Sequence, residues 1–295
     1  MDKALSKKKW IILFLTPALL LYTFTVFVPI IWSSVYSLFS WNGISAMKFA
    51  GLSNYSKLFS DSYFIQSFKN NLVFVVINVI GQLFVGAFVA VLLCYITKGR
   101  ELLKTLYFAP VVLSCVAVAK IWSKFYGIDP DGVVNAILGF LHLGELRRAW
   151  IGNMDTALVG VSVIECYWHM GLFMAIIYSG LISVSNDVIE SATLDGASVW
   201  KIFWKIRLPL IVDVLTIAFV MCINGCLKAF DVTFLATSGG PGHATELVAT
   251  YMYKTAFTSA KYGYGSAVAM FLVIESIVAV ALIRKVGDMA NKIMD

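Results

Sequence analysis

The chain has 295 residues, of which 60% are hydrophobic and only 14% are charged, and its formal net charge is +6. A soluble globular protein carries roughly 25% charged residues, so this composition excludes a soluble domain and indicates an integral membrane protein. The positive charge requires no nucleic-acid partner, because basic residues beside anionic membrane lipid account for it.

Six apolar segments are long enough to cross a bilayer as helices, which takes roughly 20 apolar residues each. Residues 10–47 and 70–97 contain no charged side chain. We expect the first helix to be retained, because it is too long for a signal peptide and no cleavage motif follows it. The predicted fold is an all-α membrane protein with a short tail, residues 1–9, and one transmembrane domain, residues 10–295. Its spans are expected at about residues 10–36, 71–97, 106–126, 157–183, 210–236 and 264–283.

The distribution of Lys and Arg predicts the orientation of these spans. With the N-terminus inside, the inner segments hold 13 basic residues and the outer segments hold 7. Since inner loops carry the excess of positive charge, both termini are expected in the cytoplasm. The segment between the fourth and fifth spans, residues 185–209, is then cytoplasmic as well.

The five cysteines all lie within the predicted spans. Cys222 and Cys226 are one helical turn apart, but no His or carboxylate completes a ligand set beside them. They are therefore interpreted as small, polarizable packing residues, and no metal site is predicted.

The segment 185–209 predicts two short helices separated by a glycine turn. Ser185, Asn186 and Asp187 are good N-cap residues for a helix that ends at Leu194. Gly196 suits the left-handed residue that terminates such a helix. Ser198 can cap a second helix, residues 199–206. Pro209 cannot continue that helix but can open the next span.

Each of these two helices has about two turns, fewer than the roughly 12–15 residues that a helix needs for stability alone in water. They must therefore dock on another surface. A membrane-interface hairpin would explain the second helix, with Trp200 and Phe203 among the lipid headgroups. It does not explain the acidic, small-residue face of the first helix, which is typical of a protein–protein contact.

The same segment resembles the EAA loop of permease subunits of bacterial ABC importers. That pattern reads E-A-A, then D-G-A, then an aromatic-rich helix ending in I-x-L-P. A serine replaces the first alanine, and residues 185–187 stand where the family usually has a proline. The resemblance implies a coupling helix that docks in a cleft of a separate ATPase subunit. The matching residues are Glu190, Ser191, Ala192, Asp195, Gly196, Ala197, Trp200, Phe203 and Pro209.

Residues 227–257 resemble the end of the fifth span and the following outer loop of carbohydrate permeases. The matching residues are Phe230, Asp231, Thr237, Gly239, Gly240, Pro241, Thr245, Glu246, Ala249, Thr250 and Tyr251. The glycine-rich turn is not a phosphate loop, because a Walker A motif needs Gly-Lys before Ser or Thr, and the chain contains no Gly-Lys pair.

Together the two stretches resemble the maltose, glycerol-phosphate and multiple-sugar permease family. This implies import of a sugar, most simply an oligosaccharide, across the bacterial cell membrane. The implied partners are a second permease subunit, two ATPase subunits and an extracytoplasmic sugar-binding protein. The chain itself is expected to bind no cofactor, since ATP and Mg²⁺ would be held by the ATPase.

Ionisable groups within spans are costly and are functional candidates by default. Glu165, Trp168 and His169 share one face of the fourth span. Asn224, Lys228 and Asp231 follow at spacings of four and three on the fifth span, which predicts a second common face. Planar polar groups and an aromatic ring are what sugar hydroxyls and C–H faces need, so these six residues are candidates for the substrate pathway.

Structural interpretations of the same residues stay open. Glu165 and His169 can form a hydrogen-bonded pair that seals the bundle, and Lys228 and Asp231 can form an ion pair. Asn78 and Gln82 are interpreted as polar contacts between helices, Lys120 and Lys124 as snorkelling lysines. Glu275 has no evident partner in the sequence.

Three alternative functions remain open. The first is an ABC permease for a peptide, an amino acid or a sugar acid. The second is an ion-coupled secondary transporter that uses Glu165 or Asp231 as a proton relay. The third is an intramembrane enzyme with Glu165 and His169 as its catalytic pair. No nucleophile motif or metal-binding repeat supports the third, so no catalytic residue is predicted.

Overall fold

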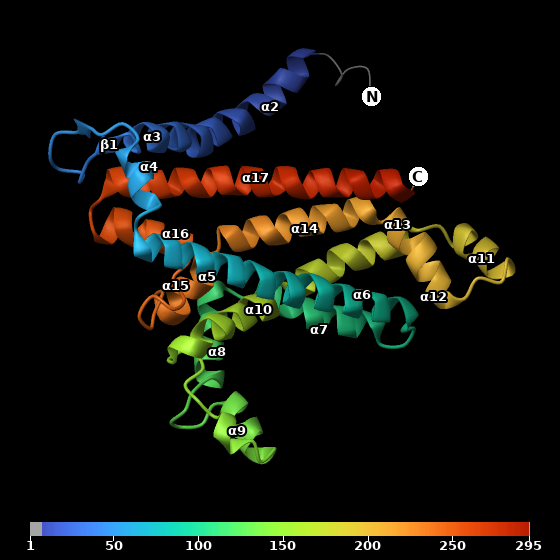
Figure 1. Cartoon of the computed structure of the whole chain (residues 1–295). Helices are drawn as coiled ribbons and strands as arrows, with labels where there is room; N and C mark the ends of the chain where they lie inside the picture. Colours follow the sequence, from blue (N-terminus) through green and yellow to red (C-terminus); the bar gives the residue numbers. More distant parts are fainter. Residues whose placement is uncertain (1–7, 295) are drawn as a thin grey trace. The chain divides into compact units, whose positions relative to one another are not determined.

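The structure, a computed structural model, describes residues 8–294 of the chain. The residues group into two compact units, and each is described separately (Figure 1). The first unit runs to Asp61 and includes Met252–Val273; the second comprises Ser62–Tyr251 and the chain from Ile274 onward. Of the predicted N-terminal tail, residues 1–7 lie outside the described part.

The first unit contains the first span and a small hairpin. The span is a continuous helical stretch with a π-helical turn at its middle, and none of its most apolar window is buried within the chain. Its side chains are thus available to lipid or to another subunit. The elements are α2 (Lys8–Tyr22), η1 (Thr23–Phe27), α3 (Val28–Tyr36), β1 (Phe39–Ser40), β2 (Lys48–Phe49), α4 (Ser53–Leu58) and η5 (Lys254–Thr258).

The second unit is built around α10 (Met154–Ser183), the fourth span, which packs against the second and third spans. Two glycines permit the close crossings. A Cβ atom on Gly86 would lie 3.1 Å from the backbone nitrogen of Met174, and one on Gly171 would lie 2.9 Å from the Cα of Phe108. The second span consists of α5 (Ser62–Asn78), the π-helical turn η2 (Val79–Phe84) and α6 (Val85–Tyr95).

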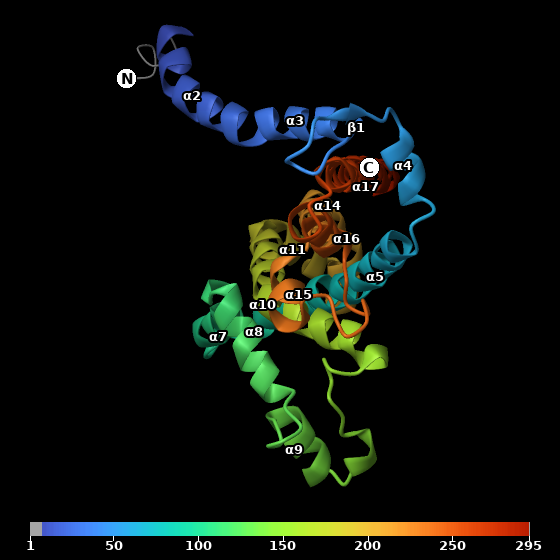
Figure 2. The same cartoon turned by 90° about the vertical axis from the view of Figure 1, so that its left-hand side faces the viewer.

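The third predicted span, residues 106–126, is two helices rather than one. The first, α7 (Arg100–Val112), and the second, α8 (Cys115–Phe125), meet at an angle of 101°. The second helix begins after Ser114, which is its N-cap residue: the Ser114 side chain accepts a hydrogen bond from the Ala117 amide at 3.3 Å. Figures 1 and 2 show α8 leading away from α7 toward α9 (Val133–Phe140).

The fifth predicted span is also interrupted. It consists of α14 (Val212–Leu227) and α15 (Asp231–Thr237), joined by three residues outside either helix. The remaining elements are η3 (Gly144–Leu146), α16 (Val248–Tyr253) and α17 (Tyr262–Met294), which passes from the first unit into the second.

The prediction of an all-α fold with six spans is confirmed. Among residues 8–294, five helices are long and apolar enough to cross a membrane, and the count is six when the bent pair α7–α8 is taken as one span. The segment 185–209 is helical as predicted, with α11 (Asn186–Leu194), α12 (Val199–Ile202), a π-helical turn η4 (Phe203–Arg207) and α13 (Leu208–Leu210).

Candidate functional site

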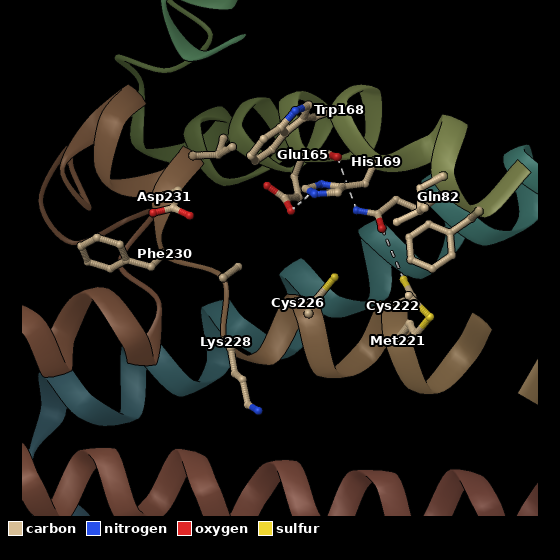
Figure 3. Close-up of a pocket in the computed structure, with 15 residues that line it drawn as sticks. Gln82, Glu165, Trp168, His169, Met221, Cys222, Cys226, Lys228, Phe230 and Asp231 are labelled. Atoms are coloured by element: carbon tan, nitrogen blue, oxygen red, sulfur yellow. Dashed lines mark hydrogen bonds and ion pairs between the residues drawn. The ribbon is translucent and has the colours of Figure 1, made fainter. Parts of the chain in front are cut away.

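A cavity of about 340 Å³ opens in the second unit between the second, fourth and fifth spans. Figure 3 shows that its wall carries carboxylate, imidazole, amide, indole and thiol groups. The labelled lining residues are Gln82, Glu165, Trp168, His169, Met221, Cys222, Cys226, Lys228, Phe230 and Asp231. Five of the six predicted pathway residues therefore border one cavity.

Glu165 and His169 point toward one another in this cavity, as their spacing of one helical turn predicts (Figure 3). The Nδ1 atom of His169 lies 3.0 Å from Oε1 of Glu165, and the two side chains are 28% and 12% exposed. Glu165 and His169 are thus paired with one another and also line the cavity. They present a carboxylate and an imidazole to a molecule that enters it.

Trp168 has a structural contact in addition to its place in the cavity wall. Its indole N–H donates to the Leu113 carbonyl at 3.2 Å, at the break between α7 and α8. Its ring centroid lies 4.4 Å from that of His169. The indole therefore satisfies a carbonyl that the bent helix leaves free, while its face remains in the wall.

Gln82 lines the cavity but was predicted only as a contact between helices. That contact is present, because its Nε2 donates to the Glu165 carbonyl of α10 at 3.4 Å. The same Nε2 donates to Oδ1 of Asn78, one turn earlier on the second span, at 2.8 Å. The thiol of Cys222 lies 3.6 Å from its Oε1. The only sequence feature that could have indicated a cavity role for Gln82 is a polar side chain within a charge-free run. The π-helical turn η2 directs this side chain toward the cavity.

The predicted common face of Asn224, Lys228 and Asp231 is wrong. The helix ends at Leu227, and Phe230 has φ −134° and ψ −53°, so Asp231 starts a separate helix and the spacing to Asn224 and Lys228 no longer fixes its face. Asp231 borders the cavity, whereas Asn224 is not among the lining residues. Figure 3 shows the side chains of Lys228 and Asp231 pointing in different directions, so the alternative of a direct ion pair is not realised in this conformation.

The glycine-rich outer turn is fastened by hydrogen bonds from threonine and asparagine side chains. Thr245 Oγ1 donates to the Gly240 carbonyl at 2.8 Å. Asn70, on α5, donates to the carbonyls of His243 and Glu246, each at 3.0 Å. His243 Nδ1 contacts Oε2 of Glu246, whose side chain is buried. The turn is therefore held against the second span.

Asn71 on the same helix is fully buried and was not singled out from the sequence. Its amide donates to the Cys226 carbonyl at 3.3 Å and accepts from the Val248 amide at 3.1 Å.

We expect Asn71→Leu to lower the melting temperature markedly, because each unpaired buried backbone group costs about 1–3 kcal/mol. Thermal denaturation of the detergent-solubilised chain measures this. Lys69→Leu, at an exposed position of α5, is the control, and equal melting of both variants would contradict the assignment.

The loop 185–209 ends its first helix in a Schellman motif, which the positions of Asp195, Gly196 and Ala197 specify. The Gly196 amide donates to the Thr193 carbonyl and the Ala197 amide to the Ala192 carbonyl, both at 3.0 Å. Gly196 has φ +78°, the left-handed conformation that favours glycine. The prediction of a glycine-terminated helix is confirmed.

The second helix of the loop also begins as predicted but ends differently. Ser198 Oγ accepts from the Lys201 amide at 3.3 Å, as an N-cap residue does. The helical path then continues through η4 to α13, and Pro209 lies in the first turn of that new helix, as the prediction that it opens the next span requires. The π-helical turn starts a new helix at Leu208, so Pro209 falls in a first turn, where its missing N–H costs no bond.

The helix α11 has no buried residue, and Leu194 is 89% exposed. Figure 1 shows it beyond the ends of α10 and α14, joined to them by the rest of the loop. Ile189 is half-buried against the hydrophobic core of the second unit, and most of the other side chains of this nine-residue helix are exposed. The helix is therefore presented as a surface for another molecule.

Comparisons with known proteins agree with this architecture. Residues 82–295 match the family described as binding-protein-dependent transport system inner membrane component. The Probable ABC transporter permease protein YurN of Bacillus subtilis is 34% identical, over 89% of this chain and 90% of that protein. The Multiple sugar-binding transport system permease protein MsmF of Streptococcus mutans is 30% identical, over 94% and 95%.

The fold also matches a solved importer. A chain of the bacterial alginate ABC transporter, in complex with an alginate pentasaccharide-bound periplasmic protein, superposes with a TM-score of 0.83 at 20% identity, covering 98% of both chains. This chain therefore belongs to the family of inner-membrane components of binding-protein-dependent transport systems. Members of that family are multi-pass transport subunits rather than enzymes.

Proposed function

We propose that the chain is a permease subunit of an ATP-driven, binding-protein-dependent importer of a sugar, most simply an oligosaccharide. In this proposal residues 10–295 form one transmembrane domain that contributes half of the translocation pore. A second permease contributes the other half. Both termini are cytoplasmic, in keeping with the excess of basic residues in the inner segments.

The observation that carries the proposal is the exposed helix α11 with its Schellman end. A short helix with a rigid terminus transmits movement without bending, provided that a partner covers its exposed side. We infer that Glu190, Ser191 and Ala192 dock on an ATPase subunit and that Gly196 fixes the angle to the next helix. One ATPase lies under each permease, and ATP and Mg²⁺ are bound there and not by this chain.

A gentle purification of the tagged chain from its own membranes tests this assembly. The expected result is co-purification of a second permease, an ATPase and an extracytoplasmic sugar-binding protein, with ATP hydrolysis stimulated by the loaded binding protein. Uptake that survives ATP depletion while a proton gradient remains would favour the ion-coupled alternative. A chain that is purified alone would remove the proposal.

The sugar assignment is supported by the similarity to MsmF, a permease of a multiple sugar-binding transport system, and by the chemistry of the cavity wall. Carboxylates, an amide and an indole face are groups that hold hydroxyls and the C–H faces of a sugar ring. Screening sugars, peptides and amino acids against the co-purified binding protein separates these substrate classes.

Neutralising the cavity carboxylates is expected to slow transport without affecting assembly. Glu165→Gln and Asp231→Asn each keep the side-chain shape but replace one hydrogen-bond acceptor with a donor. We expect uptake by the reconstituted transporter to fall at least about tenfold in each variant, which corresponds to about 1.4 kcal/mol. Glu101→Gln, at a carboxylate that is 81% exposed and outside the cavity, should transport normally. Normal uptake by both cavity variants would restrict Glu165 and Asp231 to structural roles.

A further inference from the structure

A second cavity, of about 390 Å³, lies in the first unit and carries three lysines. Lys48 is on β2, Lys57 is on α4 and Lys261 directly precedes α17. The wall also contains the aromatic rings of Trp41 and Tyr264. Three of the seven basic residues assigned to the outer side therefore converge on one site, although Lys48 and Lys261 are more than two hundred positions apart in the chain.

The segments that carry the three lysines are held in place by buried polar contacts. Asn54, on α4, donates to the carbonyls of Ser37 at 2.8 Å and Phe39 at 3.0 Å, which fastens α4 to the start of the hairpin. The Gly263 amide donates to the Trp41 carbonyl at 3.2 Å, which fastens the start of α17 to the same hairpin. The backbone segments that carry the three lysines are thus fixed relative to one another before any ligand arrives.

Lys57 is further positioned by an aromatic ring. Its Nζ lies 4.9 Å from the ring centroid of Tyr264, within the range of a cation–π interaction. The hydroxyl of Tyr264 donates to Oδ2 of Asp61 at 2.7 Å, which sets the ring orientation. The carboxylate of Asp61 therefore orients the Tyr264 ring that contacts Lys57.

The residues described as lining this cavity include no Asp or Glu. Three like charges around one concave surface repel each other, and an anion that enters the cavity relieves that repulsion. Lysine offers three donors in freely rotating directions, which suits carboxylate groups that arrive in varied geometries. The cavity is consequently an anion-binding site by shape and charge.

We propose that this cavity docks acidic side chains on the surface of the extracytoplasmic binding protein. The inference rests on the proposed function, which places the hairpin on the outer side and supplies the partner. The polar lining, with Asn42 and Ser45 beside the lysines, fits carboxylates better than the acyl chain of a lipid. Exposed apolar residues flank it in the same hairpin: Ile44 is 93% and Phe49 is 74% exposed. A charged rim beside apolar anchors is the composition of a protein interface.

Charge reversal of the three lysines tests the proposal. The complete transporter, in nanodiscs of phosphatidylcholine, is mixed with the ligand-loaded binding protein that co-purifies with it, and association is followed by interferometry at several salt concentrations. For Lys48→Glu/Lys57→Glu/Lys261→Glu we expect the association rate to fall at least about tenfold at low salt and its salt dependence to flatten, because rim charges act mainly on encounter.

Two control variants separate a docking role from a general effect. Lys69→Glu reverses an exposed lysine that does not line the cavity and should leave association unchanged. Lys57→Arg keeps the positive charge and should bind nearly as the wild type does. A charge-reversed transporter that still hydrolyses ATP at its basal rate is correctly assembled, so a slower association then reports on docking.

The outcomes distinguish this inference from the function on which it rests. A binding protein that fails to associate with the wild-type transporter would overturn the proposed function itself. A binding protein that associates equally with the wild type and the triple variant would overturn only the docking assignment. Loss of co-purified anionic phospholipid from the triple variant, with unchanged binding-protein association, would overturn the docking assignment and identify the cavity as a lipid site.

Discussion

Gly196→Pro is expected to abolish transport while the chain remains in the membrane. Gly196 has φ +78°, whereas proline is restricted to about −65°, and its amide donates to the Thr193 carbonyl, a bond that proline cannot make. The Schellman end of α11 would therefore be lost, and with it the fixed angle between the two loop helices. Uptake into proteoliposomes should fall to background, and ATP hydrolysis should lose its stimulation by the binding protein.

A milder pair of variants isolates the conformational effect. Gly196 and Gly99 both have left-handed φ values, +78° and +77°, and a Cβ on either would meet no atom within 4 Å. Alanine at either position therefore costs about the same strain, of order 1–2 kcal/mol. Gly196→Ala should weaken coupling, while Gly99→Ala, between α6 and α7, should not. Equal transport by the two would mean that the loop angle is unimportant.

The acidic residue at the start of the motif gives a second test of the same loop. Glu190→Lys reverses an exposed charge on α11 without changing any buried contact. If this face docks on an ATPase, transport should be lost while the protein level in the membrane is normal. Wild-type uptake in this variant would remove the docking assignment of α11.

Gly171→Leu is expected to prevent the chain from accumulating in folded form. Gly171 lies where α10 crosses α7, and a Cβ there would lie 2.8 Å from the Tyr107 carbonyl carbon and 2.9 Å from the Cα of Phe108. Backbone atoms cannot rotate away as a flexible side chain can, so the helices must separate. Overpacking typically costs about 1–3 kcal/mol, and the bulk of leucine should place this variant above that range.

Detergent-solubilised melting curves, read by size-exclusion chromatography, measure this loss. Gly171→Ala should already melt at a lower temperature than the wild type. Gly139→Ala, on α9 with no atom within 4 Å of the added Cβ, should melt normally or slightly higher, because alanine is the better helix former. Wild-type melting of Gly171→Ala would show that the crossing of α7 and α10 can relax.

Much of the fold could be predicted because the governing interactions are local or compositional. Six spans follow from the lengths of the apolar runs, since a bilayer accepts only long apolar helices. The shape of the loop follows from Ser185, Gly196 and Ser198, whose backbone and capping preferences act within a few residues. The break at Ser114 was not predicted because an apolar run continues through it, and the break after Leu227 was not predicted because Lys228 and Asp231 were assigned to one continuous span.

Which side chains meet was settled by packing between distant segments. Gln82 reaches the cavity wall through a π-helical turn, and Lys228 is turned away from Asp231 by a helix end that hydropathy does not register. The sequence places Lys48, Lys57 and Lys261 only among the outer basic residues. The structure brings them to one cavity, because the hairpin, α4 and the start of α17 pack together. Helix caps and turns depend on neighbouring residues, so they can be predicted from the sequence. A site assembled from remote segments depends instead on how whole helices cross. Those crossings depend on contacts such as that of Gly171 with the α7 backbone.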